Sequence, residues 1–150
     1  MIAVGAAAFL AGWFYTGGPR PYGYAGFGEL FVFVFFGLVA TVGTTYVQLE
    51  KIAGISVAAA IAVGLLATAL LVTNNLRDIP TDRVAGKQTL AVRIGDRATR
   101  MLYVAMVVAV FAVIVAIAVA DRPWAALALI GAVFAVFFAR TMRTDLEEQS

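Results

Sequence analysis

Long apolar runs alternate with short polar segments along this chain. Three runs of about 20 residues cover 29–48, 54–73 and 101–120, and a somewhat shorter one covers 124–140. A helix needs about 20 apolar residues to cross the hydrocarbon core of a bilayer, so each run is expected to span a membrane. The run over 2–14 is too short for this and is expected to be a partial helix. The pattern predicts an all-α integral membrane protein with four full transmembrane helices and an N-terminal partial one.

Two polar segments are expected as long loops on the same side of this helical bundle. Residues 15–28 contain five glycines and two prolines, which favour a loop. Residues 74–100 hold three of the nine acidic and six of the eleven basic residues. Nine basic residues fall on the side of these loops and only Lys51 and Arg122 on the other, so the positive-inside rule places both loops in the cytoplasm. Two such loops could enclose a single site.

Composition narrows the chemistry available to that site. The chain is 63% hydrophobic and only 13% charged, with a mean hydropathy of +0.94, well outside the range of soluble domains. Its net charge is only +2, so no nucleic-acid partner is expected. It contains no Cys and no His, which excludes thiolate chemistry and the commonest metal ligand. Any bound metal is therefore expected to be a hard, oxygen-liganded cation such as Mg²⁺.

Asp78 and Asp82 are the candidate metal ligands and catalytic residues. They are four residues apart, which places two side chains on the same face of a helix. Pro80 lies between them, so a helix either ends near Ile79 or restarts there with the proline in its first turn. In either case the two carboxylates can converge on one Mg²⁺ ion whose other ligands are water and phosphate oxygens.

Neighbouring side chains extend this candidate site. Asn74 and Asn75 offer carboxamide oxygens, and several cations would neutralise phosphate charge. These cations are Arg77, Arg83, Lys87 and Arg93. The alternative is a charged loop that only serves membrane orientation. That alternative accounts for the basic residues but poorly for the two aspartates, because acidic residues contribute little to orientation.

The first loop is rich in aromatic residues, namely Tyr15, Tyr22, Tyr24 and Phe27. They suit either a belt at the membrane interface or the wall of an apolar pocket, and both interpretations remain open. In the second interpretation Tyr15 and Tyr22 are candidate substrate contacts.

The segment NNLRDIPTDRVAGKQTLAVRIGDRATR over 74–100 resembles the second aspartate-rich motif of the UbiA-type intramembrane prenyltransferases. Within that family it is most similar to the 1,4-dihydroxy-2-naphthoate polyprenyltransferases of menaquinone synthesis. The stretch YTGGPRPYGYAGFGELFVFVFFG over 15–37 resembles the loop and helix that precede the motif in the same subfamily. The match is much longer than a bare pair of aspartates and covers nearly the whole chain.

This resemblance implies part of a nine-helix membrane bundle in the plasma membrane that joins a polyprenyl diphosphate to 1,4-dihydroxy-2-naphthoate, with loss of CO₂ and formation of demethylmenaquinone. Carried over by position, Asp78 and Asp82 would hold Mg²⁺ on the diphosphate. Asn74 or Asn75 would assist the metal site. Phosphate oxygens would be contacted by Arg77 and Lys87, and Arg93 is a third candidate for such a contact. The apolar cavity would shelter the allylic cation from water.

Three alternatives or departures accompany the resemblance. The substrate could be another aromatic acceptor. The chain could also be a non-enzymatic membrane scaffold whose cations bind lipid headgroups. Finally, the family carries two aspartate-rich motifs, whereas this chain has one, and Glu29 and Glu50 are isolated acids in the sequence. We therefore expect a C-terminal part of such an enzyme.

These 150 residues alone are expected to be inactive, because half of the diphosphate site would be absent. The measurement is prenyl transfer in membranes that contain only this polypeptide. Detectable product there would contradict the expectation.

Overall fold

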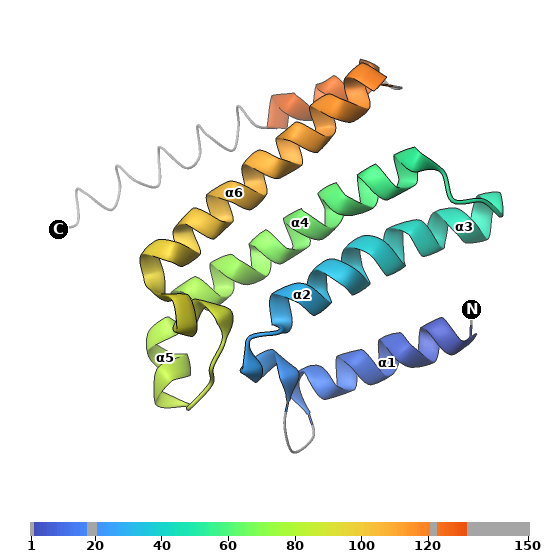
Figure 1. Cartoon of the computed structure of the whole chain (residues 1–150). Coiled ribbons are helices and arrows are strands. Elements are labelled where there is room, and N and C mark those ends of the chain that lie inside the picture. The colour runs from blue at the N-terminus through green and yellow to red at the C-terminus, as the bar shows by residue number, and fades with distance from the viewer. Residues whose placement is uncertain (1, 18–20, 121–122, 132–150) are drawn as a thin grey trace. The chain divides into compact units, whose positions relative to one another are not determined.

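The computed structural model describes residues 2–17, 21–120 and 123–131, and every regular element in these ranges is helical (Figure 1). No strand occurs in them, which confirms the all-α prediction. The elements are α1 (Ile2–Thr16), η1 (Tyr22–Ala25), α2 (Gly28–Val32), η2 (Phe33–Val42), α3 (Gly43–Leu49), α4 (Gly54–Arg77), α5 (Ile79–Val84), α6 (Leu90–Ala120) and η3 (Pro123–Leu129). Segments η1 and η3 are 3₁₀-helical, and η2 is a π-helical stretch within one continuous helix over 28–49.

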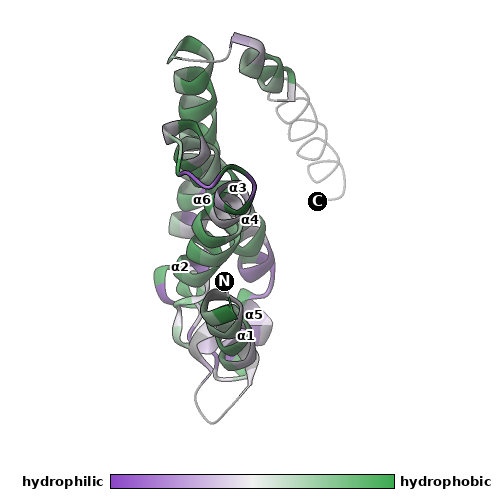
Figure 2. Ribbon diagram, turned by 90° about the vertical axis from the view of Figure 1, so that its right-hand side faces the viewer, coloured by the Kyte–Doolittle hydropathy of each residue, from purple (hydrophilic) through white to green (hydrophobic). Residues whose placement is uncertain are grey.

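Three helices are long and apolar enough to cross a membrane, namely Gly28–Leu49, Gly54–Arg77 and Leu90–Ala120. Figure 2 shows hydrophobic residues along most of their length and hydrophilic residues mainly near helix ends. The apolar part of α1 is shorter, Gly5–Tyr15. Of the span expected over 124–140, only the first eight residues fall in the described ranges, and they belong mainly to η3. These findings indicate a multi-pass membrane protein.

The segment 74–100, expected as a loop, is largely helical. Helix α4 continues to Arg77, and α5 follows after Asp78 with Pro80 in its first turn. Proline is favoured in this position because its missing N–H would have no partner there. Of the two possibilities for Pro80, the structure has the restarted helix. The remaining non-helical part is the short connection from Ala85 to Thr89.

Helix α6 begins at Leu90, before the run expected to span the membrane, and is interrupted at Gly95. Gly95 has φ +80° and ψ 173°, a backbone conformation that glycine adopts at little cost. The Thr99 hydroxyl donates to the Gly95 carbonyl at 2.7 Å and supports the restart of the helix. The interruption separates the first turn of α6, which carries Arg93, from the apolar helix that follows.

The chain divides into two compact units, Met1–Val110 and Phe111–Ser150, and the packing that matters for the site lies in the first. There, η2 and α4 run antiparallel and meet at Gly37 and Gly64. A Cβ atom on Gly37 would lie 2.6 Å from Cα of Gly64 and 2.8 Å from the carbonyl oxygen of Ala60. The two helices therefore touch along their backbones, as small residues permit in membrane proteins.

Replacement of Gly37 by Ala is expected to force these helices apart. Overpacking of this kind costs about 1–3 kcal/mol, so Gly37→Ala should lower the thermal unfolding midpoint of the natural full-length protein in detergent. Gly43→Ala is the matched control, because a Cβ on Gly43 would meet nothing within 4 Å. The control should be neutral or slightly stabilising, since Ala is the better helix former. Equal midpoints for the two variants would contradict the proposed backbone contact.

Candidate functional site

The two polar segments predicted from the sequence are in direct contact. The Gln88 N–H donates to the Tyr24 carbonyl at 2.8 Å, and Arg93 Nε donates to the Gln88 carbonyl at 3.0 Å. Gly26 lies against the same place: its φ is +82°, and a Cβ there would come within 3.1 Å of the Gln88 carbonyl oxygen. The first loop thus packs on the connection between α5 and α6.

Asp82 lies at the centre of this contact. Its side chain is only 8% exposed, and Lys87 Nζ lies 3.0 Å from its Oδ1. The Lys87 N–H also donates to the Asp82 carbonyl at 2.9 Å. The ammonium lies 4.8 Å from the centre of the Tyr24 ring, within the range of a cation–π interaction. The hydrogen bond to Asp82 raises the pKa of Lys87, so this side chain is charged at neutral pH.

Asp78 occupies the junction between α4 and α5 and is more open to solvent. Its carboxylate accepts hydrogen bonds from Arg77 Nε at 2.9 Å and Nη2 at 3.4 Å. The hydrogen bond from Arg77 lowers the pKa of Asp78, and the charge of Lys87 acts in the same direction. Lys87 therefore interacts electrostatically with both aspartates. The predicted pair of acids and two of the predicted cations form one cluster.

Asn75, three residues before Asp78, binds a carboxylate that is isolated in the sequence. Its Nδ2 donates to Glu29 Oε1 at 2.9 Å, although the two residues are 46 positions apart in the chain. Glu29 is only 7% exposed, and its Oε2 has no hydrogen-bond partner among the described residues. The sequence contained one signal for Glu29, namely an ionisable residue at the start of an apolar span, where such residues mark functional sites.

Two of the other predicted site residues are exposed or have different partners. The Asn74 side chain is exposed, and its carbonyl accepts the Asp78 N–H at 3.0 Å. Arg93 is used in the contact with Gln88. Tyr22 begins η1, and the prediction for its side chain lies outside the part of the chain that is described.

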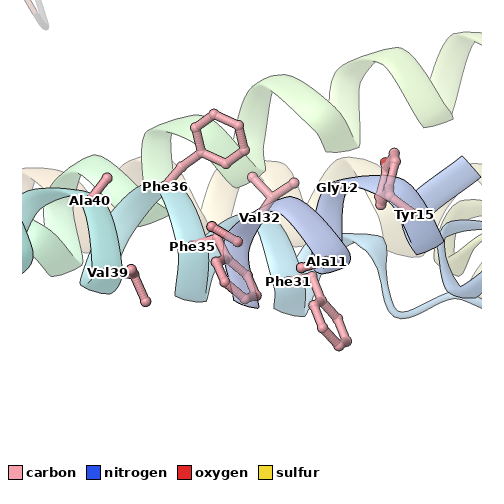
Figure 3. Close-up of a pocket in the computed structure, with 10 residues that line it drawn as sticks. Ala11, Gly12, Tyr15, Phe31, Val32, Phe35, Phe36, Val39 and Ala40 are labelled. Carbon is pink, nitrogen blue, oxygen red and sulfur yellow. The ribbon is translucent and has the colours of Figure 1, made fainter. Parts of the chain in front are cut away.

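Tyr15 lines an apolar cavity of about 600 Å³ between α1 and the helix over 28–49 (Figure 3). Phe31 and Phe35 stack on one side of it, with ring centroids 6.1 Å apart. The full lining is Ala8, Ala11, Gly12, Tyr15, Phe31, Val32, Phe35, Phe36, Val39 and Ala40. Tyr15 also reaches the start of α2, where its hydroxyl lies 3.2 Å from the position of a Cβ on Gly28. The cavity therefore approaches the residue that precedes Glu29.

The donor atoms of the aspartate cluster suit one Mg²⁺ ion. They are carboxylate oxygens, which Mg²⁺ prefers as ligands, and cations for phosphate charge lie beside them. Within the described ranges no group of three or more His, Cys, Asp or Glu residues could enclose a metal. The arrangement thus fits an ion that takes its remaining ligands from phosphate and water, and it does not fit a closed protein cage.

Comparisons with known proteins found related sequences. The profile of the UbiA prenyltransferase family matches residues 1–150. The chain is 50% identical over 144 residues to a 1,4-dihydroxy-2-naphthoate octaprenyltransferase of Mycobacterium tuberculosis, which covers 96% of this chain and 49% of that protein. A protein of the same name from Mycobacterium leprae is 46% identical over 96% of this chain and 49% of its own length. Another from Bacillus subtilis is 32% identical over 81% of this chain and 40% of its own length. The chain thus spans about half the length of the curated relatives it matches, and no solved structure matches significantly.

Substitution of Lys87 by Met is expected to loosen the contact between the two loops. It removes a hydrogen bond between charged groups, a class worth about 1.5–3 kcal/mol before solvent screening. Hydrogen exchange of the Gln88 amide, which bonds to Tyr24 across the contact, should therefore accelerate roughly tenfold in the natural full-length protein. Lys51→Met removes an exposed lysine elsewhere and serves as the control. Unchanged Gln88 exchange in Lys87→Met would contradict this role of the ion pair.

Proposed function

The chain belongs to the UbiA prenyltransferase family, and we propose that its protein transfers a polyprenyl group from polyprenyl diphosphate to 1,4-dihydroxy-2-naphthoate. The observation that carries this proposal is the cluster of Asp78, Asp82 and Lys87 within a sequence 50% identical to an octaprenyltransferase of that name. As in the family resemblance, the ring carboxylate leaves as CO₂ and the product is demethylmenaquinone.

The cluster would bind the diphosphate end of the prenyl substrate. Asp78 and Asp82 would hold Mg²⁺, with Asn74 or Asn75 assisting, and the bound ion would neutralise charge on the leaving diphosphate. Lys87 remains charged beside Asp82 and would contact a phosphate oxygen near the same carboxylate. Arg77 beside Asp78 supplies a second cation, and Arg93 a possible third. Fixed cations of this kind stabilise the charge that develops as the diphosphate departs.

The apolar cavity beside α1 would accept the prenyl chain. Its lining is aliphatic and aromatic, with Tyr15 at the end nearest Glu29. A site closed to water protects an allylic cation until the electron-rich ring attacks it. As the family resemblance implies, the protein would lie in the plasma membrane. The two contacting loops would face the cytoplasm, because nine of the eleven basic residues are expected on that side.

Two other functions are distinguished by specific observations. Transfer to a different aromatic acceptor would use the same aspartate cluster, and the names of the relatives argue against it. A membrane scaffold that binds lipid headgroups would use the cations and would have no need of Asp78 and Asp82. The inactivity expected of the 150 residues alone stays a prediction.

Replacement of Asp78 or Asp82 by Ala in the natural full-length protein should reduce prenyl transfer by about 100-fold or more, the loss typical of removing one group that stabilises developing charge. Activity should also disappear on chelation of divalent cations and return when Mg²⁺ is added. The measurement is formation of prenylated product in membranes, normalised to the amount of inserted protein.

Asp96→Ala is the matched control for these variants. Asp96 belongs to the same polar segment but pairs with the exposed Arg100 at 2.7 Å, outside the aspartate cluster. It should retain activity within about twofold, as surface substitutions usually do. Full activity of Asp78→Ala or Asp82→Ala would exclude the proposed enzyme, and unchanged or stronger binding to anionic lipid vesicles by those variants would then favour the scaffold.

A further inference from the structure

Glu29 is the buried ionisable group that the diphosphate site does not use. Its side chain lies at the start of α2, and the residue is only 7% exposed. Among the described residues no Lys or Arg forms an ion pair with it. Asn75 donates to Oε1, and Oε2 has no hydrogen-bond partner there. A buried carboxylate oxygen without a donor is costly, so its presence needs an explanation, such as a bound ligand, a catalytic role or a buried water.

The position of Glu29 lies between the two parts of the proposed substrate site. On one side, Glu29 accepts from Asn75, which lies three residues before Asp78 of the aspartate cluster, less than one turn of helix. On the other side, Gly28 contacts Tyr15 of the apolar cavity, and Phe31 of the same helix lines that cavity. In a prenyl diphosphate, the reacting carbon is bonded to the charged diphosphate on one side and to the apolar chain on the other. The reacting carbon would therefore lie near the junction that Glu29 occupies.

We propose that Glu29 binds the aromatic substrate by accepting a hydrogen bond from one of its ring hydroxyls at Oε2. The inference rests on the function proposed above and names the residue that would orient the ring. Asn75 holds Oε1 and thereby sets the orientation of the carboxylate. A hydroxyl donor satisfies the unpartnered oxygen, and a carboxylate acceptor increases the electron density of the ring that attacks the allylic carbon. Specificity follows as well, because a site built for a hydroxyl rejects analogues that lack the donor.

Glu29→Gln is the informative substitution. The glutamine carbonyl can still accept from Asn75, but an NH₂ donor then replaces the free acceptor oxygen. In the natural full-length protein, KM for 1,4-dihydroxy-2-naphthoate should rise about 10- to 100-fold, the range expected for loss of a hydrogen bond to a charged group. KM for the polyprenyl diphosphate should stay within about twofold, because the aspartate cluster is unchanged. Glu50→Gln makes the same chemical change at an exposed glutamate and should alter neither constant.

Methylated substrates provide a second measurement that tests the hydrogen bond itself. Naphthoates with either the 1- or the 4-hydroxyl converted to a methoxy group have lost one donor. With the unsubstituted protein, one of the two should compete at least about tenfold less well than the parent naphthoate. With Glu29→Gln, the same analogue should compete at most about threefold less well than the parent. If Glu29→Gln does not accumulate in membranes, competition with the unsubstituted protein decides. If both methylated naphthoates bind as well as the parent naphthoate, the inference is overturned.

The remaining outcomes separate the inference from the function on which it rests. If the unsubstituted protein transfers the prenyl group but Glu29→Gln leaves KM for the naphthoate unchanged, the inference is overturned and the proposed function stands. Equal increases in both KM values also overturn it, because Glu29 would then only support Asn75 and the aspartate cluster. Absence of any transfer to 1,4-dihydroxy-2-naphthoate by the unsubstituted protein overturns the function and the inference together.

Discussion

The backbone contact between Gly37 and Gly64 sets the geometry on which the site depends. At this crossing η2 and α4 are so close that a single added Cβ would fall 2.6 Å from the opposing backbone. Lipid offers little hydrophobic force to bring helices together, so close packing and hydrogen bonds must hold them. Beyond the crossing, the start of α2 and the end of α4 stay adjacent, and Glu29 can meet Asn75 there. Thr68 reinforces this part of α4 by donating to the Gly64 carbonyl at 2.7 Å.

Much of this architecture could be predicted from local patterns. Apolar runs of membrane-spanning length predicted the all-α class, and the spacing around Pro80 allowed the restarted helix that carries Asp82. The motif that contains Asp78, Asp82 and Lys87 was identified because its residues are near one another in sequence, where helical periodicity relates them.

Features that depend on tertiary contact could not be predicted in the same way. The pairing of Glu29 with Asn75 joins residues 46 positions apart and requires the crossing at Gly37, so nothing in the local pattern of either segment indicates it. The helical nature of most of 74–100 was missed for a different reason. High polarity was interpreted as a loop, although amphipathic helices at a membrane surface are polar as well. The kink at Gly95 depends on a backbone conformation that a glycine permits but does not require.

Asp78, Asp82 and Glu29 differ in the partners of their carboxyl groups, and that difference indicates that they bind different parts of the substrates. Asp78 is partly open to solvent and paired with Arg77, and Asp82 is buried but paired with Lys87. In the proposed function each would give up its cationic partner to phosphate when Mg²⁺ binds, so neither carboxylate would be left without a compensating positive charge. Glu29 has only the neutral carboxamide of Asn75, so a second anion such as diphosphate would be repelled there. The naphthoate also carries a carboxylate, so its ring would have to present a hydroxyl, and not that carboxylate, to Glu29. A hydroxyl can donate to Oε2, whereas diphosphate oxygens mainly accept, and this difference favours the ring hydroxyl at Glu29 and the diphosphate at Asp78 and Asp82.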